Sequence, residues 1–184
     1  GQYDTVTEVM WVTGAALFIR LADYREVGGL DGHFFAHMEE IDLCWRLRSR
    51  GKKLVCIPQS VVYHVGGATL KKENPRKTFL NFRNNLLMLY KNLPDKELEH
   101  VLFIRGILDR VAALVFYLKK DRANARAVMQ ARREFEDIRY SFAASRIENM
   151  MKSTDEIIPE RTHFSIVMKY YLLGKKHFSQ LKLF

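Results

Sequence analysis

The stretch that decides the fold of this chain is Phe34-Phe-Ala-His-Met-Glu-Glu-Ile-Asp-Leu-Cys-Trp-Arg46. Residues 39–50 predict a helix that opens with acidic residues and closes with arginines, an order that suits the helix dipole. Gly51 follows as the stop signal. Three carboxylates, Glu39, Glu40 and Asp42, crowd the first turn of this helix. Acids at a helix N-terminus stabilise it by about 0.3–1 kcal/mol each, so helix capping is one explanation of the cluster.

Short strand and helix patterns surround this helix. Asp23, with Glu26 three residues on, predicts the capped start of a short helix that ends at Gly28-Gly29. Strands are predicted for residues 14–20, 53–57 and 60–65, and residues 6–12 alternate imperfectly. We therefore expect the first 70 residues to form part of a mixed sheet with one main helix on it. An exposed edge of that sheet would tend to pair with another chain, which would give a homodimer.

The organisation changes near Gly66-Gly67, and after Lys71 the whole pattern is helical. Apolar residues recur at three- and four-residue steps, which predicts an amphipathic helix from about residue 98 to 118. Three more helices are predicted over residues 76–92, from Asp121 to about 142, and over 164–173. The predicted fold class is α/β for residues 1–70, followed by a basic α-helical region over residues 71–184.

Composition and charge narrow the class of protein. The 184 residues are 48% hydrophobic, which excludes a disordered or fibrous chain. The longest apolar run, Val111 to Leu118, is too short to span a bilayer, which needs about 20 residues. Cys44 and Cys56 are interpreted as small core residues of a reducing compartment. Net charge is −1 over residues 1–70 and +10 over residues 71–184, so the second region is expected to meet an anionic partner.

Taken together, the motifs resemble the second half of a family 2 glycosyltransferase catalytic domain, and within that family they resemble the rhamnosyltransferases. The resemblance implies the GT-A nucleotide-diphospho-sugar transferase fold. The resemblance covers about residues 9–68. It rests on an ordered set with compatible gaps: Trp11-Val-Thr-Gly-Ala-Ala-Leu-Phe-Ile-Arg20, Val27-Gly-Gly-Leu-Asp31, Phe34-Phe35, Glu39-Glu-Ile-Asp-Leu-Cys-Trp-Arg46, Gly51, Pro58 and His64. Such enzymes transfer a sugar from a nucleotide-sugar donor to a glycan or lipid-linked acceptor.

The resemblance implies an inverting reaction in which Glu40 is the general base. A carboxylate can take the proton of an acceptor hydroxyl, and burial raises its pKa toward that task. The family more often has Asp at this position, so either Glu39 or Glu40 could be the base. Asp42, the third acid of the candidate catalytic set, would support the site or the helix start.

Other site residues follow from the same resemblance. Gly14 and Ala15 are expected to keep the floor of the substrate pocket low, since small residues permit close approach. Trp45 and Arg46 are candidates for substrate binding, although core packing for Trp45 and charge in the last helical turn for Arg46 are the favoured explanations. His64 would be a metal ligand, because imidazole suits Mn²⁺ while Mg²⁺ prefers oxygen.

The resemblance implies that the family's nucleotide-binding half, with an Asp-x-Asp motif, would supply most of the ligands of the divalent cation (Mn²⁺ or Mg²⁺). No Asp-x-Asp occurs in this chain. We therefore interpret residues 1–70 as the carboxy-terminal half of the catalytic domain, and expect this fragment alone to be inactive.

Two alternatives come from other classes of protein: a basic helical module that binds nucleic acid, or one that mediates assembly. Acids interspersed in Arg132-Arg-Glu-Phe-Glu-Asp-Ile-Arg139 make nucleic-acid binding the weaker alternative. For the transferase, we expect a role in polysaccharide biosynthesis and a cytoplasmic location, peripheral at the inner face of the cell membrane. The basic and aromatic segment Lys169-Tyr-Tyr-Leu-Leu-Gly-Lys-Lys-His-Phe178 predicts salt-sensitive contact with anionic lipid.

Overall fold

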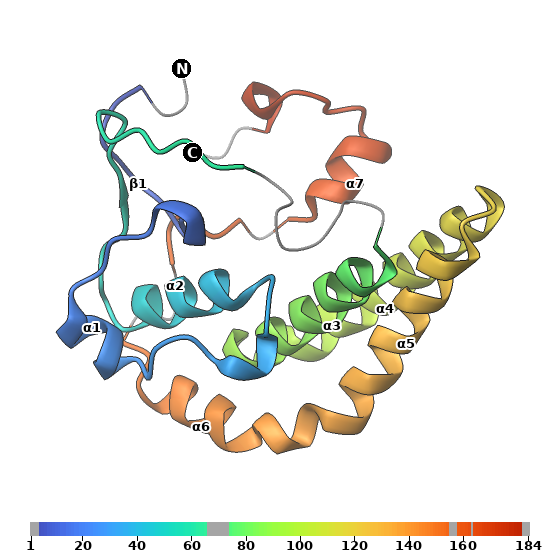
Figure 1. The fold of residues 1–184 in the computed structure, drawn as a ribbon, viewed down its shortest axis with the longest axis horizontal. Coiled ribbons are helices and arrows are strands. Elements are labelled where there is room, and N and C mark those ends of the chain that lie inside the picture. Colours follow the sequence, from blue (N-terminus) through green and yellow to red (C-terminus); the bar gives the residue numbers. More distant parts are fainter. Residues whose placement is uncertain (1–3, 66–73, 155–157, 163, 182–184) are drawn as a thin grey trace.

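The structure, a computed structural model, describes residues 4–65, 74–154, 158–162 and 164–181. Helices dominate these residues, and Gly66, Gly67 and Lys71, where the sequence pattern changes, lie outside them. Figure 1 shows the elements, which are α1 (Leu21–Glu26), α2 (Glu39–Ser49), α3 (Pro75–Asn92), α4 (Asp95–Leu118), α5 (Arg122–Ile138), α6 (Ala143–Met151) and α7 (Ile166–Tyr171), with strands β1 (Thr7–Glu8) and β2 (Val55–Cys56).

The helical prediction for the second region is confirmed. α3 starts at Pro75 behind an Asn74 side chain that accepts a hydrogen bond from the Arg76 amide at 2.9 Å. Asp121 caps α5 in the same way, through the Asn124 amide at 3.1 Å. α5 packs against both α3 and α4, and α6 then turns back against α3 (Figure 1). The sequence rhythm missed the separation of α5 from α6, which a 3₁₀ turn at Arg139–Phe142 produces.

The strand predictions for the first region are largely wrong. Residues 14–20 contain a 3₁₀ turn at Gly14–Ala16, capped by Thr13, and Phe18 is 88% exposed where a buried strand was expected. Residues 60–65 form no strand and are exposed. The described residues contain one ladder, in which β1 pairs antiparallel with β2 over two residues on each strand. A strand needs a neighbour for its backbone groups, and these segments have none among the described residues.

The helix prediction around residues 39–50 is confirmed, and the one around Asp23 is partly wrong. α2 covers Glu39–Ser49, and Gly51 follows it with φ +75°. α1 begins two residues before Asp23, and its N-cap residue, Arg20, makes no side-chain cap. Gly28 and Gly29 end α1 with positive φ angles, as expected.

The helix α2 is the centre of the molecule because its two faces contribute to two apolar clusters. Leu43, Cys44 and Leu47 pack with Val27 and Leu54, while Trp45 packs with residues of α3, α4 and α5. The larger of these two clusters is thus built from both predicted regions. The chain is mainly helical with a small strand pair, and the GT-A fold stays a prediction.

Candidate functional site

The loop that leads into α2 has an unusual backbone. Phe35, His37 and Met38 all have positive φ values between 61° and 73°, which is costly for residues with a side chain. Met38 is the N-cap residue of α2 and makes no side-chain cap. The loop is therefore not explained by local capping, and its conformation must be imposed from elsewhere in the molecule.

Asn84 of α3 imposes it. This side chain is fully buried, and its amide nitrogen donates to the carbonyl oxygens of Phe34, Ala36 and His37 at 2.8–2.9 Å. Next to it, Arg83 donates to the His33 carbonyl at 3.0 Å. A helix of the second region therefore fixes the loop that positions the acidic start of α2.

Glu39 and Glu40 stand at that start with unpaired oxygen atoms. The Oε2 atom of each is buried, and neither has a hydrogen-bond partner among the described residues. Burial raises the pKa of Glu40 above its ordinary value, and the negative charge of Glu39 raises it further, although hydrogen bonds from the backbone amides of Glu40 and Ile41 oppose both effects. A half-buried carboxylate with a raised pKa and a free oxygen can accept a proton, as a general base must.

Gly14 lies against Glu40, and its role as the floor of a substrate pocket stays a prediction. A methyl group added at Gly14 would sit 3.7 Å from Cβ of Glu40, in ordinary van der Waals contact. Ala15 is in the same exposed 3₁₀ turn, where its amide faces the Thr13 hydroxyl at 3.4 Å. The structure thus brings together Gly14 and Glu40, which are 26 positions apart in the sequence.

His37 is a neighbour of Glu40 that the sequence reasoning missed. Its Nε2 atom is buried without a partner, and its positive charge would act to lower the pKa of Glu40. Nothing in the sequence pattern marks this histidine as a site residue. Its position two residues before Glu39 was visible in the sequence. That position indicates a contact with Glu40 only once the positive φ angles of the loop are known.

Asp42 has a structural environment quite unlike that of the two glutamates. It is fully buried, and its Oδ2 atom accepts hydrogen bonds from Arg46 at 2.8 and 3.0 Å and from Lys91 at 2.9 Å. Its Oδ1 atom accepts from Asn92 at 2.8 Å. With all its acceptor positions engaged inside the protein, Asp42 supports the helix start and holds α3 against α2.

Lys91 links this network to the glycine-rich turn. Its ammonium group lies 2.7 Å from Asp31 and 2.9 Å from Asp42, and above the ring of Phe34. Burial alone would raise the pKa of Asp31, but the hydrogen bond and charge of Lys91, aided by His33, lower it to about 2. No sequence pattern pointed to Lys91 or Asn92, because both lie in α3, far from the motifs.

Trp45 and Arg46, the candidate substrate contacts, are both buried. Trp45 packs in the larger apolar cluster, with the Arg161 guanidinium over its ring at 5.7 Å. Arg46 bonds to Asp42 and to the carbonyl oxygens of Val27 and Gly29. These contacts give both side chains the packing and pairing roles that the sequence left open beside substrate binding.

His64, the candidate metal ligand, lies in the exposed segment 61–65. Among the described residues, no three His, Cys, Asp or Glu side chains gather as a metal site would need. Cys44 and Cys56 are free thiols, and burial raises the pKa of Cys44, as suits a core residue.

Comparison with known proteins gives relatives of one kind. The chain is 31% identical over 141 residues to a pre-mycofactocin glycosyltransferase of Mycobacterium tuberculosis, a match that covers 71% of this chain and 29% of that protein. It is 38% identical over 56 residues to an N-acetylglucosaminyl-diphospho-decaprenol L-rhamnosyltransferase of the same species, covering 30% of this chain and 18% of the relative. The rhamnosyltransferase WbbL of Escherichia coli is 36% identical over 61 residues, 33% of this chain and 22% of its own length.

No family model and no solved structure matches the chain. The matched stretches span less than a third of each of these relatives. Their agreement in kind, together with the acidic start of α2, bears out the resemblance drawn from the motifs. The chain is a portion of a rhamnosyltransferase-like glycosyltransferase.

Proposed function

We propose that this chain carries the general base of an inverting, family 2 glycosyltransferase, and that the base is Glu40. The observation that supports the proposal most directly is the state of this side chain. One of its oxygen atoms is buried without a hydrogen-bond partner among the described residues, burial raises its pKa, and Gly14 lies against it.

The reaction would be a single displacement at the anomeric carbon of a nucleotide sugar. Glu40 accepts the proton of the acceptor hydroxyl as that oxygen forms its bond to the anomeric carbon. The bond from this carbon to the nucleoside diphosphate breaks on the opposite face, and the leaving group takes the electron pair. Attack from the face opposite the leaving group inverts the anomeric configuration.

Surrounding groups set the position of Glu40. Asp42, paired with Arg46 and Lys91, fixes the first turn of α2 from below, and Asn84 fixes the loop before it. Since a general base must lie within hydrogen-bond reach of the proton it takes, these contacts matter more than the identity of the acid alone. A positive charge on His37 would oppose the rise in the pKa of Glu40.

We also propose that the donor is a nucleotide sugar and the acceptor a glycan or a lipid-linked glycan. The name of the mycobacterial N-acetylglucosaminyl-diphospho-decaprenol L-rhamnosyltransferase supports a lipid-linked acceptor. A divalent cation, Mn²⁺ or Mg²⁺, would neutralise the diphosphate when bound, with His64 as one ligand. The described residues offer no complete set of ligands for it, so no step is assigned to the metal. The expected cytoplasmic location at the inner face of the cell membrane also stays a prediction.

The test is the Glu40→Gln variant of the intact enzyme that contains this chain. Release of nucleoside diphosphate is measured across a panel of nucleotide sugars with a glycan acceptor extract. We expect the transfer rate to fall by about 10²–10⁴-fold, the usual contribution of a positioned base, while donor binding measured by calorimetry is retained.

Glu39→Gln is the matched control, since it removes the same charge one residue away. It should lower the rate much less than Glu40→Gln does. Near-normal transfer by Glu40→Gln would refute the assignment, and a large loss in Glu39→Gln alone would move the role to Glu39.

A further inference from the structure

The outer face of α4 is apolar over most of its length and has no partner among the described residues. Its exposed side chains recur at steps of three, four or one residues, so they share one side of the helix. They are Phe103, Ile107, Val111, Leu114, Val115 and Leu118. From first to last they extend over about 22 Å at 1.5 Å per residue. We call these residues the α4 stripe.

This exposure is not the usual scatter of single apolar residues. Phe103 is 69% exposed and Leu118 is 71% exposed, at opposite ends of the stripe. The inner side of α4, in contrast, buries Leu102, Gly106 and Ala113. A continuous exposed apolar face of this kind marks an interaction site or an aggregation risk, so something is expected to cover it.

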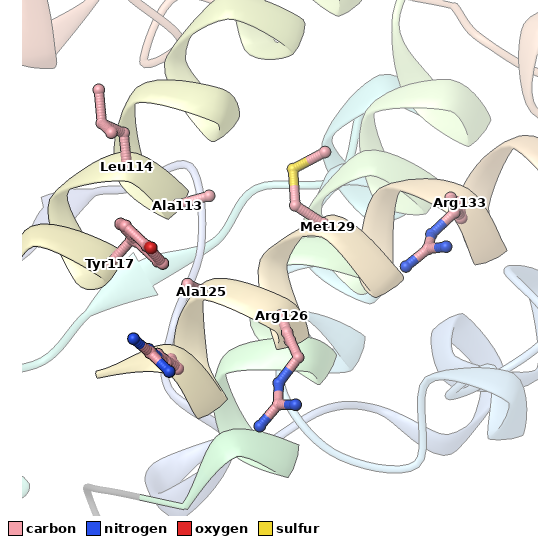
Figure 2. Close-up of a pocket in the computed structure, with 8 residues that line it drawn as sticks. Ala113, Leu114, Tyr117, Ala125, Arg126, Met129 and Arg133 are labelled. Carbon is pink, nitrogen blue, oxygen red and sulfur yellow. The ribbon is translucent and has the colours of Figure 1, made fainter. Parts of the chain in front are cut away.

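Basic side chains border the stripe where α4 meets α5. Arg122, Arg126, Met129 and Arg133 follow one another at steps of four, three and four residues, which places them along one side of α5. Together with Ala113, Leu114 and Tyr117 of α4 they line a depression of about 410 Å³ (Figure 2). The Arg122 guanidinium lies 5.8 Å from the centre of the Tyr117 ring. The depression is apolar on the α4 side and cationic on the α5 side.

The positive charge of this end of the molecule is only partly balanced by acids. Asp109 of α4 is buried and already pairs with Arg105 and Arg132, and Asp121, in the turn before α5, accepts hydrogen bonds from Asn124. Arg110, Lys119, Lys120, Arg122, Arg126 and Arg133 remain exposed. The turn between α4 and α5, which carries Lys119 and Lys120, projects from one end of the molecule (Figure 1). A flat anionic surface could therefore approach it without obstruction.

We propose that the α4 stripe and the basic residues of the α4–α5 end dock on an anionic lipid surface. An apolar helical face bordered by Lys and Arg, with an aromatic ring between them, is the pattern of a helix that lies in a membrane interface. A second copy of the chain would bring two groups of six positive charges together, which opposes pairing through this face. Nucleic acid would leave the apolar stripe uncovered.

The docking is peripheral. Although α4 is 24 residues long, neither it nor any other helix that the structure describes carries an apolar window sufficient to cross a bilayer. The surface also differs from the one that the sequence pointed to, which was the segment around α7 and Lys175-Lys176. The proposal is independent of Glu40, so its failure would leave the proposed catalytic role untouched.

The experiment is co-sedimentation of the full chain with two kinds of vesicle, one of neutral phosphatidylcholine and one with 30% phosphatidylglycerol. We expect binding to the anionic vesicles, weaker binding at high salt, and little binding to the neutral ones. Each neutralised basic residue should weaken partitioning by about fivefold. The double variant Arg122→Gln/Arg126→Gln should thus lose at least tenfold.

A second variant, Leu114→Gln/Leu118→Gln, tests the apolar contribution and should also bind less. Both side chains are exposed, so circular dichroism should show unchanged folding. The matched controls are Lys175→Gln/Lys176→Gln and Leu172→Gln/Leu173→Gln, which change the same residue types in the exposed segment after α7. These controls should bind as the unchanged chain does.

Three results would overturn the proposal. The first is absent binding to anionic vesicles, or equal binding to both kinds. The second is loss of binding in the control variants while the α4–α5 variants still bind. The third is a dimer in solution, seen by light scattering, that Leu114→Gln/Leu118→Gln dissociates, because a second copy would then cover the stripe.

Discussion

The two regions of the molecule, residues 4–65 and residues 74–154, differ in how far they satisfy their own backbone hydrogen bonds and bury their apolar side chains. Helices α3 to α6 pair their backbone groups internally and pack on one another. The first region has one ladder of two residues per strand among its described residues, and it exposes Phe18, Tyr63 and Val65 almost fully. The difference follows from hydrogen bonding, since a helix satisfies its backbone locally and a strand depends on its neighbours.

The two regions are nevertheless joined by a buried polar interface. Asp31, Asp42 and the loop at residues 33–37 belong to the first region, and Arg83, Asn84, Lys91 and Asn92 of α3 meet them. The comparison therefore teaches that the order of the acidic site is supplied by the helical region. Two changes test this dependence, and a third tests the state of the acid that it positions.

The largest effect is expected from Lys91→Met, which removes the cation shared by Asp31 and Asp42. Because one partner of a buried ion pair is deleted, uncompensated charge is left inside, and the free energy of unfolding should fall by about 3–5 kcal/mol. Urea unfolding monitored by circular dichroism measures the loss. Lys53→Met is the control, since it breaks the exposed pair between Lys53 and Glu8 and should change stability very little. Equal losses in the two variants would show that the interface does not join the regions.

A smaller effect is expected from Asn84→Ala, which removes the side-chain donor shared by the carbonyls of Phe34, Ala36 and His37, although Phe34 keeps a hydrogen bond from the Ala36 amide. The free energy of unfolding should fall by about 1–3 kcal/mol, the cost of unsatisfied buried polar groups. Hydrogen exchange should also quicken at the amides of residues 34–42. Asn81→Ala is the matched control, because Asn81 bonds only to the Lys77 carbonyl within its own helix. Equally faster hydrogen exchange at these amides in the Asn84→Ala and Asn81→Ala variants would show that Asn84 does not fix the loop conformation.

The smallest effect is expected from Glu40→Gln on stability. The pKa of Glu40 is raised in the folded state, so the folded chain binds the proton more tightly than the unfolded chain does. Stability then falls as pH rises from the ordinary value of 4.5 through the folded pKa, and Gln avoids this loss. The variant should gain less than about 1 kcal/mol at pH 7 and nothing at pH 4.

The control for this change has the opposite sign. Glu8 has a pKa lowered by its hydrogen bond to Lys53, so Glu8→Gln should lose a little stability at pH 7 and none at low pH. Urea midpoints taken from pH 4 to pH 7 compare the two variants. A loss of stability in Glu40→Gln at pH 7 would mean that its carboxylate is satisfied in the folded chain.

Much of the helical structure was predictable from the sequence because its signals are local. The Asp121 cap, the Gly51 stop and the apolar rhythm of residues 98–118 each act within a few residues, and α5, α2 and α4 follow them. The strand predicted at residues 14–20 is wrong, and the sequence could not reveal this, because an apolar run is the same whether neighbouring strands are present or absent. The acidic cluster was visible, but the separate roles of its members were not.

The sequence by itself determined the kind of protein and the position of its acids: ordered motifs from Trp11 to His64 led to the glycosyltransferases, and Glu39, Glu40 and Asp42 were marked by their spacing alone. Only the tertiary structure decided the surroundings of each acid. It surrounds Asp42 with Arg46, Lys91 and Asn92, and leaves one oxygen of Glu40 unpaired beneath Gly14. The physical reason is that protonation and pairing depend on burial and on nearby charges, and α3 brings these from about 50 residues away in the sequence.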